Sequence, residues 1–158
     1  MGAGKTVLTL DIYTDGGCSG NPGPGGWAYV LVKDNAVTAE AWGSEPDTTN
    51  NRMELLAVIS AVKSLKNKTD PSRQDNCQVT VHTDSQYVQK GITEWIRKWK
   101  NNSWQTSDKK PVKNKDLWLE LDALAGEQNI TWKWIRGHAG NTYNERCDSL
   151  VQKAIAEG

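Results

Sequence analysis

The order of apolar patterns along the chain constrains its fold more strongly than any other feature. Three segments with the alternation of strands come first, and helix-like and strand-like segments then alternate to the end of the chain. The expected strands are residues 7–14, 27–33, 36–42, 78–83 and 130–135. The expected helices are residues 51–65, 85–100, 116–125 and 143–156. This order predicts an α/β fold whose mixed sheet combines an antiparallel hairpin with parallel strands.

Short motifs indicate where several of these helices begin or break. Thr49 or Asn50 is expected to cap the helix at residues 51–65. Thr142 and Glu145 have the spacing of a capping box at the start of the last helix. Gly91 is expected to interrupt the helical segment at residues 85–100.

Size and composition indicate a single domain, residues 1–158. The three cysteines include no CxxC pair, which suggests neither a disulfide framework nor a zinc site. No apolar run is long enough to span a bilayer, and the N-terminus does not resemble a secretion signal. We therefore expect a cytoplasmic monomer with no membrane partner.

The net charge of zero hides an uneven distribution of charge. Residues 97–115 contain seven basic residues and one acid, so this segment has a charge of +6 and the rest of the chain −6. A basic segment on an acidic body predicts an anionic partner, held beside a part of the protein in which carboxylates are concentrated.

A glycine-rich segment follows the first expected strand, which ends at Asp15. Eight of the eleven residues at 16–26 are glycine or proline. Glycine lets the main chain turn sharply and approach a large partner closely, whereas proline fixes its path. The segment is expected to be a loop, either an ordinary wide hairpin connection or a place where something large approaches Asp15.

Asp15 and Asp84 come at the ends of two expected strands, in the motifs YTD and HTD. If these strands are adjacent and parallel, both carboxylates reach the edge of the sheet where open α/β sheets place their sites. Two carboxylates brought close together repel each other, and one of them would hold a proton unless a cation lies between them.

Two further acids belong to expected helices. Glu54 lies on the apolar, inward face of its helix. Because an unpaired buried carboxylate is costly, Glu54 has either an arginine or lysine partner or a functional role. Asp148 flanks the apolar stripe of the last helix, where it either interacts with the helix dipole or joins the other acids.

Together, these four carboxylates predict a metal site. Oxygen ligands without cysteine or a ligand-spaced histidine cluster suit Mg²⁺ or Mn²⁺. A site of this kind usually holds two ions about 3.5–4 Å apart, which activate water and stabilise the leaving oxygen of a phosphodiester.

The two histidines have different expected roles. His138 lies in the motif GHAG, before the helix that carries Asp148. A lone loop histidine is more often without a catalytic role, but one beside a metal site can carry a proton to the leaving group. His82 and Asp11 lie within expected strands and are interpreted as structural.

The chain resembles type 1 ribonuclease H of the bacterial kind from about residue 7 to residue 155. The resemblance rests on four motifs in the family's order, YTDGGCSGNPGPGGW, TTNNRMEL, HTDSQYV and GHAGNTYNERCD. It implies a ribonuclease H-like fold with a mixed five-stranded sheet, and a basic protrusion at about residues 92–117. It also implies Mg²⁺-dependent hydrolysis of the RNA strand in RNA–DNA hybrids, with 5′-phosphate and 3′-hydroxyl ends.

The resemblance assigns roles to the matching residues. Asp15, Glu54, Asp84 and Asp148 become the metal-binding catalytic acids, and His138 assists proton transfer and product release. The implied contacts with the minor groove of the hybrid, where 2′-hydroxyls identify RNA, come from Gly16, Asn21, Asn50, Asn51 and Gln86. Thr49 is expected to help hold a phosphate of the DNA strand. Thr49 and Asn50 are equally suited to capping a helix.

The tryptophans of the basic protrusion have two possible roles. Trp95 and Trp99 lie on one helical face, with Trp104 and Trp118 beyond them. Either they form the small core of the protrusion, or one exposed tryptophan packs on a deoxyribose among the lysines. The expected contacts with the DNA strand are Trp99, Lys100 and Trp104.

Two other functions remain open at this point. A DNA nuclease or strand-transfer domain would keep the fold and change the substrate. A binding module would keep the hybrid partner without catalysis, although the complete set of acids argues against it.

Overall fold

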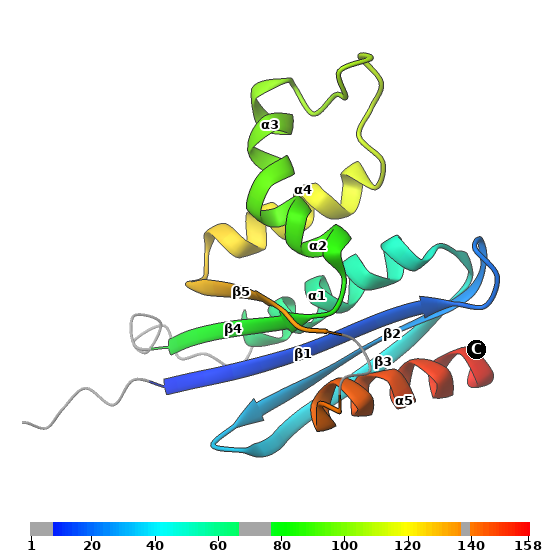
Figure 1. Ribbon diagram of the computed structural model, residues 1–158, viewed down its shortest axis with the longest axis vertical. Coiled ribbons are helices and arrows are strands. Elements are labelled where there is room, and N and C mark those ends of the chain that lie inside the picture. Colours follow the sequence, from blue (N-terminus) through cyan, green and yellow to red (C-terminus); the bar gives the residue numbers. More distant parts are fainter. Residues whose placement is uncertain (1–7, 67–76, 137–139) are drawn as a thin grey trace, which may run out of the picture.

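Five strands pair into one sheet in the computed structural model, which describes residues 8–66, 77–136 and 140–158 (Figure 1). The strands are β1 (Leu8–Cys18), β2 (Gly23–Lys33), β3 (Ala36–Thr48), β4 (Cys77–Thr83) and β5 (Ile130–Trp134). Their order across the sheet is β3-β2-β1-β4-β5. β2 runs antiparallel to both β1 and β3, whereas β4 runs parallel to both β1 and β5. The expected mixed sheet is therefore confirmed.

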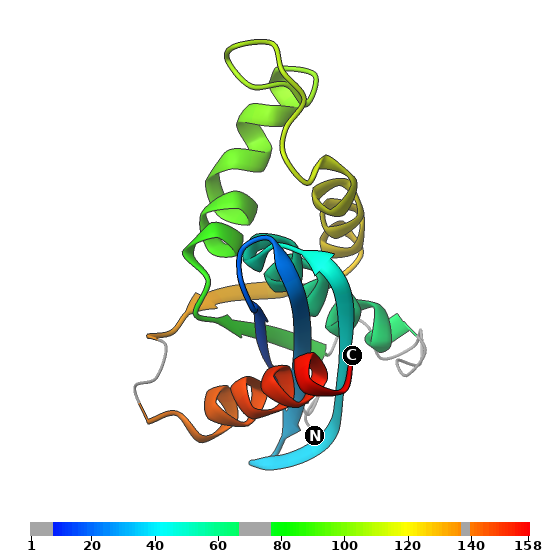
Figure 2. The same cartoon turned by 90° about the vertical axis from the view of Figure 1, so that its right-hand side faces the viewer.

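Helices cover both faces of this sheet (Figures 1 and 2). α1 (Asn50–Lys66) packs on one face, where α4 (Lys115–Gly126) lies against it. α5 (Thr142–Glu157) packs on the opposite face, against β1, β2 and β3. Buried apolar side chains fill both interfaces, among them Ile12 and Leu55 on the α1 side and Val30 and Leu150 on the α5 side. No helix in the described part of the chain has the length and apolar character needed to cross a membrane.

The glycine-rich segment belongs to a β-hairpin and is not the loop expected from the sequence. β1 continues to residue 18 and β2 begins at residue 23, so most of the glycines lie in paired strands. A Cβ atom at Gly16 would overlap the main chain of Met53 in α1, and one at Gly26 would lie 2.9 Å from the carbonyl oxygen of Val151 in α5. Local preference predicts a loop because glycine is depleted in strands, but here the close approach of two helices requires it. β3 is also longer than expected and continues to residue 48.

One continuous helical segment rises away from the sheet (Figure 2). It consists of α2 (Gln86–Lys90), a π-helical turn η2 (Gly91–Trp95) and α3 (Ile96–Asn101). The α-helix thus gives way to a π-helical turn at Gly91, where the sequence predicts an interruption, but the segment remains helical through this position. A Cβ atom at Gly91 would overlap the ring of Trp118 in α4, whose side chain is fully buried. Glycine is needed at this position for helix packing.

Gly91→Ala is expected to destabilise the protein by about 3 kcal/mol, because the added methyl group has no space beside the Trp118 ring. For a chain of this size, that corresponds to a fall in Tm of about 6–12 °C in thermal unfolding followed by circular dichroism. Gly126→Ala is the matched control, since no heavy atom lies within 4 Å of a Cβ built there. A Tm of Gly91→Ala equal to that of the wild type would contradict the described packing of Trp118.

The helix caps differ partly from those expected. Asn141 caps α5, and its Oδ1 accepts hydrogen bonds from two backbone N–H groups at 3.1 and 3.0 Å. The capping box expected at Thr142 is therefore wrong by one residue, because Thr142 is already helical. α1 is capped by Thr49, whose Oγ1 accepts a hydrogen bond from the N–H of Arg52 at 3.3 Å.

Candidate active site

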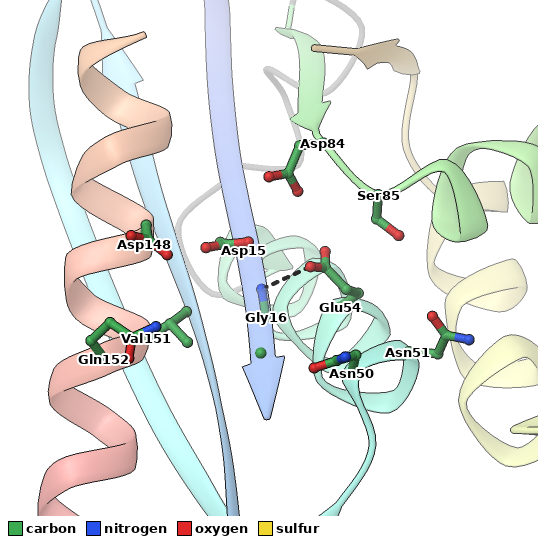
Figure 3. A pocket seen from close by; sticks show the side chains of 11 residues that line it. Asp15, Gly16, Asn50, Asn51, Glu54, Asp84, Ser85, Asp148, Val151 and Gln152 are labelled. Carbon is green, nitrogen blue, oxygen red and sulfur yellow. Dashed lines mark hydrogen bonds between the residues drawn. The ribbon is translucent and has the colours of Figure 1, made fainter. Parts of the chain in front are cut away.

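A cavity of about 390 Å³ opens between β1, the end of β4, α1 and α5 (Figure 3). The four acids singled out from the sequence all line it, namely Asp15, Glu54, Asp84 and Asp148. Neither lysine nor arginine belongs to the described lining. The four carboxylates therefore converge on one cavity.

The end of the parallel pairing between β1 and β4 brings Asp15 and Asp84 together. The last paired residues are Thr14 and Thr83, and each aspartate comes next along its chain. Asp15 is 8% exposed and also pairs with Ala28 of β2, so it lies within β1 and not at its end. The expectation that both aspartates reach one edge of the parallel strands is met, although β1 continues further.

Glu54 reaches the cavity from the buried face of α1, and its exposed fraction is 8%. Its Oε1 accepts a hydrogen bond of 3.2 Å from the main-chain N–H of Gly16 (Figure 3). Its Oε2 is buried and has no hydrogen-bond partner among the described residues. No arginine or lysine within residues 8–66, 77–136 and 140–158 forms an ion pair with Glu54, so a cationic partner does not explain its burial.

Asp148 comes from α5, on the opposite side of β1 (Figure 3). It is half-buried and lies beyond the first turn of the helix, so an interaction with the helix dipole does not explain its position. Gln152 lies one turn further along α5 and lines the same cavity. It is not among the residues expected from the sequence, although its spacing of four residues from Asp148 places it on the same helix face. Ser85, which directly follows Asp84, also lines the cavity and was not singled out.

Burial and mutual repulsion make these carboxylates hard to ionise. Burial, followed by the charges of Asp84 and Asp148, raises the pKa of Asp15 from 3.8 to about 7. Burial, followed by the charges of Asp15 and Asp84, raises the pKa of Glu54 well above its ordinary value. Without a cation, the site therefore retains protons toward neutral pH.

The oxygen atoms of the site fit a divalent cation. One carboxylate oxygen from each of Asp15, Glu54 and Asp84 lies within 4.8 Å of the other two. The buried Oε2 of Glu54 is a second indication, because a bound cation would satisfy it. Carboxylate oxygens are the ligands that Mg²⁺ and Mn²⁺ prefer.

The expected amide contacts lie around this cavity but not all within it. Asn50 and Asn51 line it, as does Gly16. The Oδ1 of Asn21 accepts a hydrogen bond of 3.2 Å from the main-chain N–H of Asn50, which joins the β1–β2 turn to the start of α1. Gln86 is the first residue of α2 and is exposed, and it does not belong to the described lining.

A second cavity, of about 360 Å³, lies beside the start of α1. Its lining residues are Asn21, Thr49, Asn51, Arg52, Lys113 and Asn114. Arg52 also forms two hydrogen bonds with the carboxylate of Asp116, at 3.0 and 3.1 Å, which connect α1 to α4. Arg52 could not be identified from the sequence, because its partner is 64 residues away.

The tryptophans of the basic protrusion pack mainly against one another. The ring centroid of Trp99 lies 5.9 Å from that of Trp95, 6.1 Å from Trp104 and 5.4 Å from Trp118. This arrangement matches the alternative in which they form a small core, although Trp99 and Trp104 remain partly exposed. The Nζ of Lys100 lies 2.9 Å from the Oδ2 of Asp122 in α4, an ion pair that the sequence did not predict.

Of the two histidines, the structure describes His82. His138 lies outside the described residues. The ring of His82 stacks on Tyr13, with centroids 4.3 Å apart, and its Nε2 lies 2.9 Å from Asp11 Oδ1. His82 is therefore packed, as expected, and Asp11 is its partner, which the sequence did not predict.

Comparison with known proteins places the chain among relatives of one family. The RNase H family model matches residues 8–156. Ribonuclease H of Francisella tularensis subsp. novicida (strain U112) is 54% identical over 145 residues, which cover 92% of this chain and 90% of the relative. Ribonuclease H of Francisella philomiragia subsp. philomiragia is 53% identical over 157 residues, which cover 99% of this chain and 97% of the relative.

Solved structures agree with this result. LC9-RNase H1, a type 1 RNase H with the type 2 active-site motif, has a TM-score of 0.80 at 30% identity, covering 98% of this chain and 75% of that one. LC11-RNase H1 in complex with an RNA/DNA hybrid has a TM-score of 0.72 at 25% identity, covering 94% of this chain and 97% of that one. The resemblance found in the sequence is thus confirmed, and the chain belongs to the ribonuclease H family, with type 1 enzymes as its structural relatives.

Proposed function

We propose that the chain is an endoribonuclease that hydrolyses the RNA strand of RNA–DNA hybrids and leaves 5′-phosphate and 3′-hydroxyl ends. The observation that carries this proposal is the convergence of Asp15, Glu54, Asp84 and Asp148 on one cavity without lysine or arginine in its described lining. Membership of the ribonuclease H family, and the hybrid bound by the related LC11-RNase H1, support the choice of substrate. We further propose that it acts as a cytoplasmic monomer.

The four carboxylates would hold two Mg²⁺ ions in the presence of substrate, with Mn²⁺ as a substitute. Such ions, when bound, supply a Lewis acid that activates water and stabilises the leaving oxygen of a phosphodiester. Asp15, Glu54 and Asp84 offer the most closely spaced oxygens, and Asp148 adds a ligand from α5. The N–H of Gly16 orients Glu54. To His138 we assign the transfer of a proton to the leaving oxygen and help in product release.

The same cavity and its neighbour suit recognition of a hybrid. Gly16, Asn50 and Asn51 would meet the minor groove, with Asn21 and Gln86 beside them, because amides both donate to and accept from hydroxyls and base edges. Thr49 and Lys113 line the second cavity, which would hold a phosphate of the DNA strand. The basic protrusion, with Trp99, Lys100 and Trp104, would follow that strand.

Cleavage assays on one sequence prepared as a hybrid, as duplex DNA and as duplex RNA test the proposal. The RNA strand of the hybrid is expected to be cut in Mg²⁺, and both duplexes are expected to remain intact. Equal cutting of duplex DNA would favour a DNA nuclease of the same fold. Binding of the hybrid without any cleavage in Mg²⁺ or Mn²⁺ would favour a binding module.

Lys113→Met is expected to weaken hybrid binding and to reduce the slope of log K against log salt by about 1, because one phosphate contact is lost. Binding titrations at several salt concentrations measure this slope. Lys63→Met is the matched control, since Lys63 pairs with Glu120 at 2.7 Å and does not belong to the described lining of either cavity. An unchanged slope for Lys113→Met would remove the second cavity from the binding surface.

A further inference from the structure

Asp84 is the first residue after β4, so its peptide group lies beyond the paired part of the sheet. β4 ends at Thr83, whose partner in β5 is Trp134, the last residue of that strand. The carbonyl oxygen of Asp84 instead accepts a hydrogen bond of 3.1 Å from the indole Nε1 of Trp134. A side chain of β5 thus holds the first peptide group after the end of β4.

The residues on both sides of Asp84 are also held. The carbonyl oxygen of Thr83 accepts a hydrogen bond of 2.8 Å from the N–H of Ile135, and its Oγ1 accepts one of 3.0 Å from the N–H of Ser85. The Oγ of Ser85 accepts a hydrogen bond of 3.2 Å from the N–H of Val88 at the start of α2. The contact from Trp134 acts on the Asp84 peptide itself.

This fixation matters because the Asp84 carboxylate lies among like charges. Its oxygen is within 4.8 Å of oxygens from Asp15 and Glu54, so without a cation the repulsion favours turning Asp84 away. Trp134 is 39% exposed, whereas Trp118 is fully buried. Packing in the core therefore explains the position of the Trp134 indole less well than that of Trp118. Its hydrogen bond to Asp84 gives the indole a local role at the site.

We propose that Trp134 is a positioning residue, whose indole N–H fixes the Asp84 peptide and thereby sets the affinity of the carboxylate cluster for divalent cations. The inference rests on the proposed role of Asp84 as a metal ligand. Partners that orient metal ligands typically change metal affinity or activity 10–100-fold when they are lost. The exposed position of this hydrogen bond places the expected effect at about the lower end of that range, near 10-fold.

Trp134→Phe tests the inference, because it keeps an aromatic ring and removes the N–H group. Mn²⁺ binding to the substrate-free protein, measured by electron paramagnetic resonance, is expected to weaken about 10-fold. The kcat for hybrid cleavage at saturating Mg²⁺ is expected to stay within about 2-fold of the wild type, since a higher cation concentration restores occupancy. A purely structural role would lower Tm and leave the Mn²⁺ affinity of the folded protein unchanged.

Two further variants sharpen the test. Trp42→Phe is the matched control, because Trp42 is 37% exposed on β3 and does not belong to the described lining of the cavity. The Nζ of Lys153 lies over its ring. The Mn²⁺ affinity of this variant should equal that of the wild type. If Trp134→Phe does not fold, 3-benzothienylalanine at position 134 replaces only the N–H by sulfur and answers the same question. The inference would be overturned if either of these two proteins, once folded, bound Mn²⁺ with an affinity within 2-fold of the wild type.

Failure of the inference is separable from failure of the proposed function. If Asp84→Asn abolishes cleavage while loss of the Trp134 N–H changes nothing, Asp84 keeps its role and Trp134 does not position it. If Asp84→Asn cleaves hybrid as the wild type does, the proposed function itself is wrong, and the inference falls with it.

Discussion

Asp15→Asn is expected to reduce cleavage of RNA–DNA hybrid by at least about 10³-fold, while hybrid binding stays within a few-fold of the wild type. The substitution keeps the shape of a residue that is 8% exposed, but removes one carboxylate of the cluster. Stabilisation of charge by bound divalent ions is worth several kcal/mol, and each 1.36 kcal/mol is a factor of about ten in rate. Single-turnover cleavage in Mg²⁺ and anisotropy titrations with a labelled hybrid measure the two quantities.

Asp34→Asn provides the control for this experiment. Asp34 is exposed in the turn between β2 and β3, at a positive φ of 53° that asparagine also tolerates. Its cleavage rate should equal that of the wild type. Substantial cleavage by Asp15→Asn would mean that the cluster is not the catalytic centre, whereas a loss of binding equal to the loss of cleavage would mean that Asp15 acts in recognition.

The metal-free protein is expected to lose stability as the pH rises from about 4 to 7, and Mg²⁺ is expected to restore it. The pKa of Asp15 is raised from 3.8 to about 7 by burial and by its acidic neighbours, so the folded protein binds an additional proton between these values. The stabilisation from this proton is complete below about pH 4 and is lost as the pH rises through 7. Glu54, whose pKa is raised for the same reasons, acts in the same direction.

Neutralising Asp15 therefore has opposite effects on stability and activity. At pH 8 in EDTA, Asp15→Asn is expected to be more stable than the wild type by about 2 kcal/mol, or about 5 °C in Tm. Added Mg²⁺ should raise the Tm of the wild type more at pH 8 than at pH 5, and should have little effect on Asp15→Asn. Thermal unfolding at both pH values, with EDTA or Mg²⁺, measures all of these. A metal-free wild type that becomes more stable between pH 5 and 8 would contradict the described repulsion.

The arrangement of the acids could be predicted because each follows from a local pattern. The motifs YTD and HTD place Asp15 and Asp84 after apolar strands, and the helical period places Glu54 on the buried face of α1. Parallel pairing of β1 and β4 then brings Asp15 and Asp84 together, and α1 adds Glu54. The order of the segments was sufficient to predict the mixed sheet for the same reason.

Features that depend on contacts between distant segments could not be predicted. Gly16 and Gly26 lie in strands because α1 and α5 approach them closely, whereas local preference favours a loop. Gly91 permits the packing of Trp118, which follows it by 27 residues, and the segment continues through it as a π-helical turn. The hydrogen bond from Trp134 to Asp84 likewise arises only once β4 and β5 have paired. No periodicity in the sequence reports such contacts.

A crystal of the wild-type protein soaked in Mn²⁺ offers the most direct test of the central claim, that the four carboxylates form one site for divalent cations. Anomalous difference density is expected in the cavity, at coordination distance from oxygens of Asp15, Glu54 and Asp84, with the Glu54 Oε2 no longer unpartnered. Absence of density there at a Mn²⁺ concentration that supports cleavage, or a manganese ion bound elsewhere, would contradict the account.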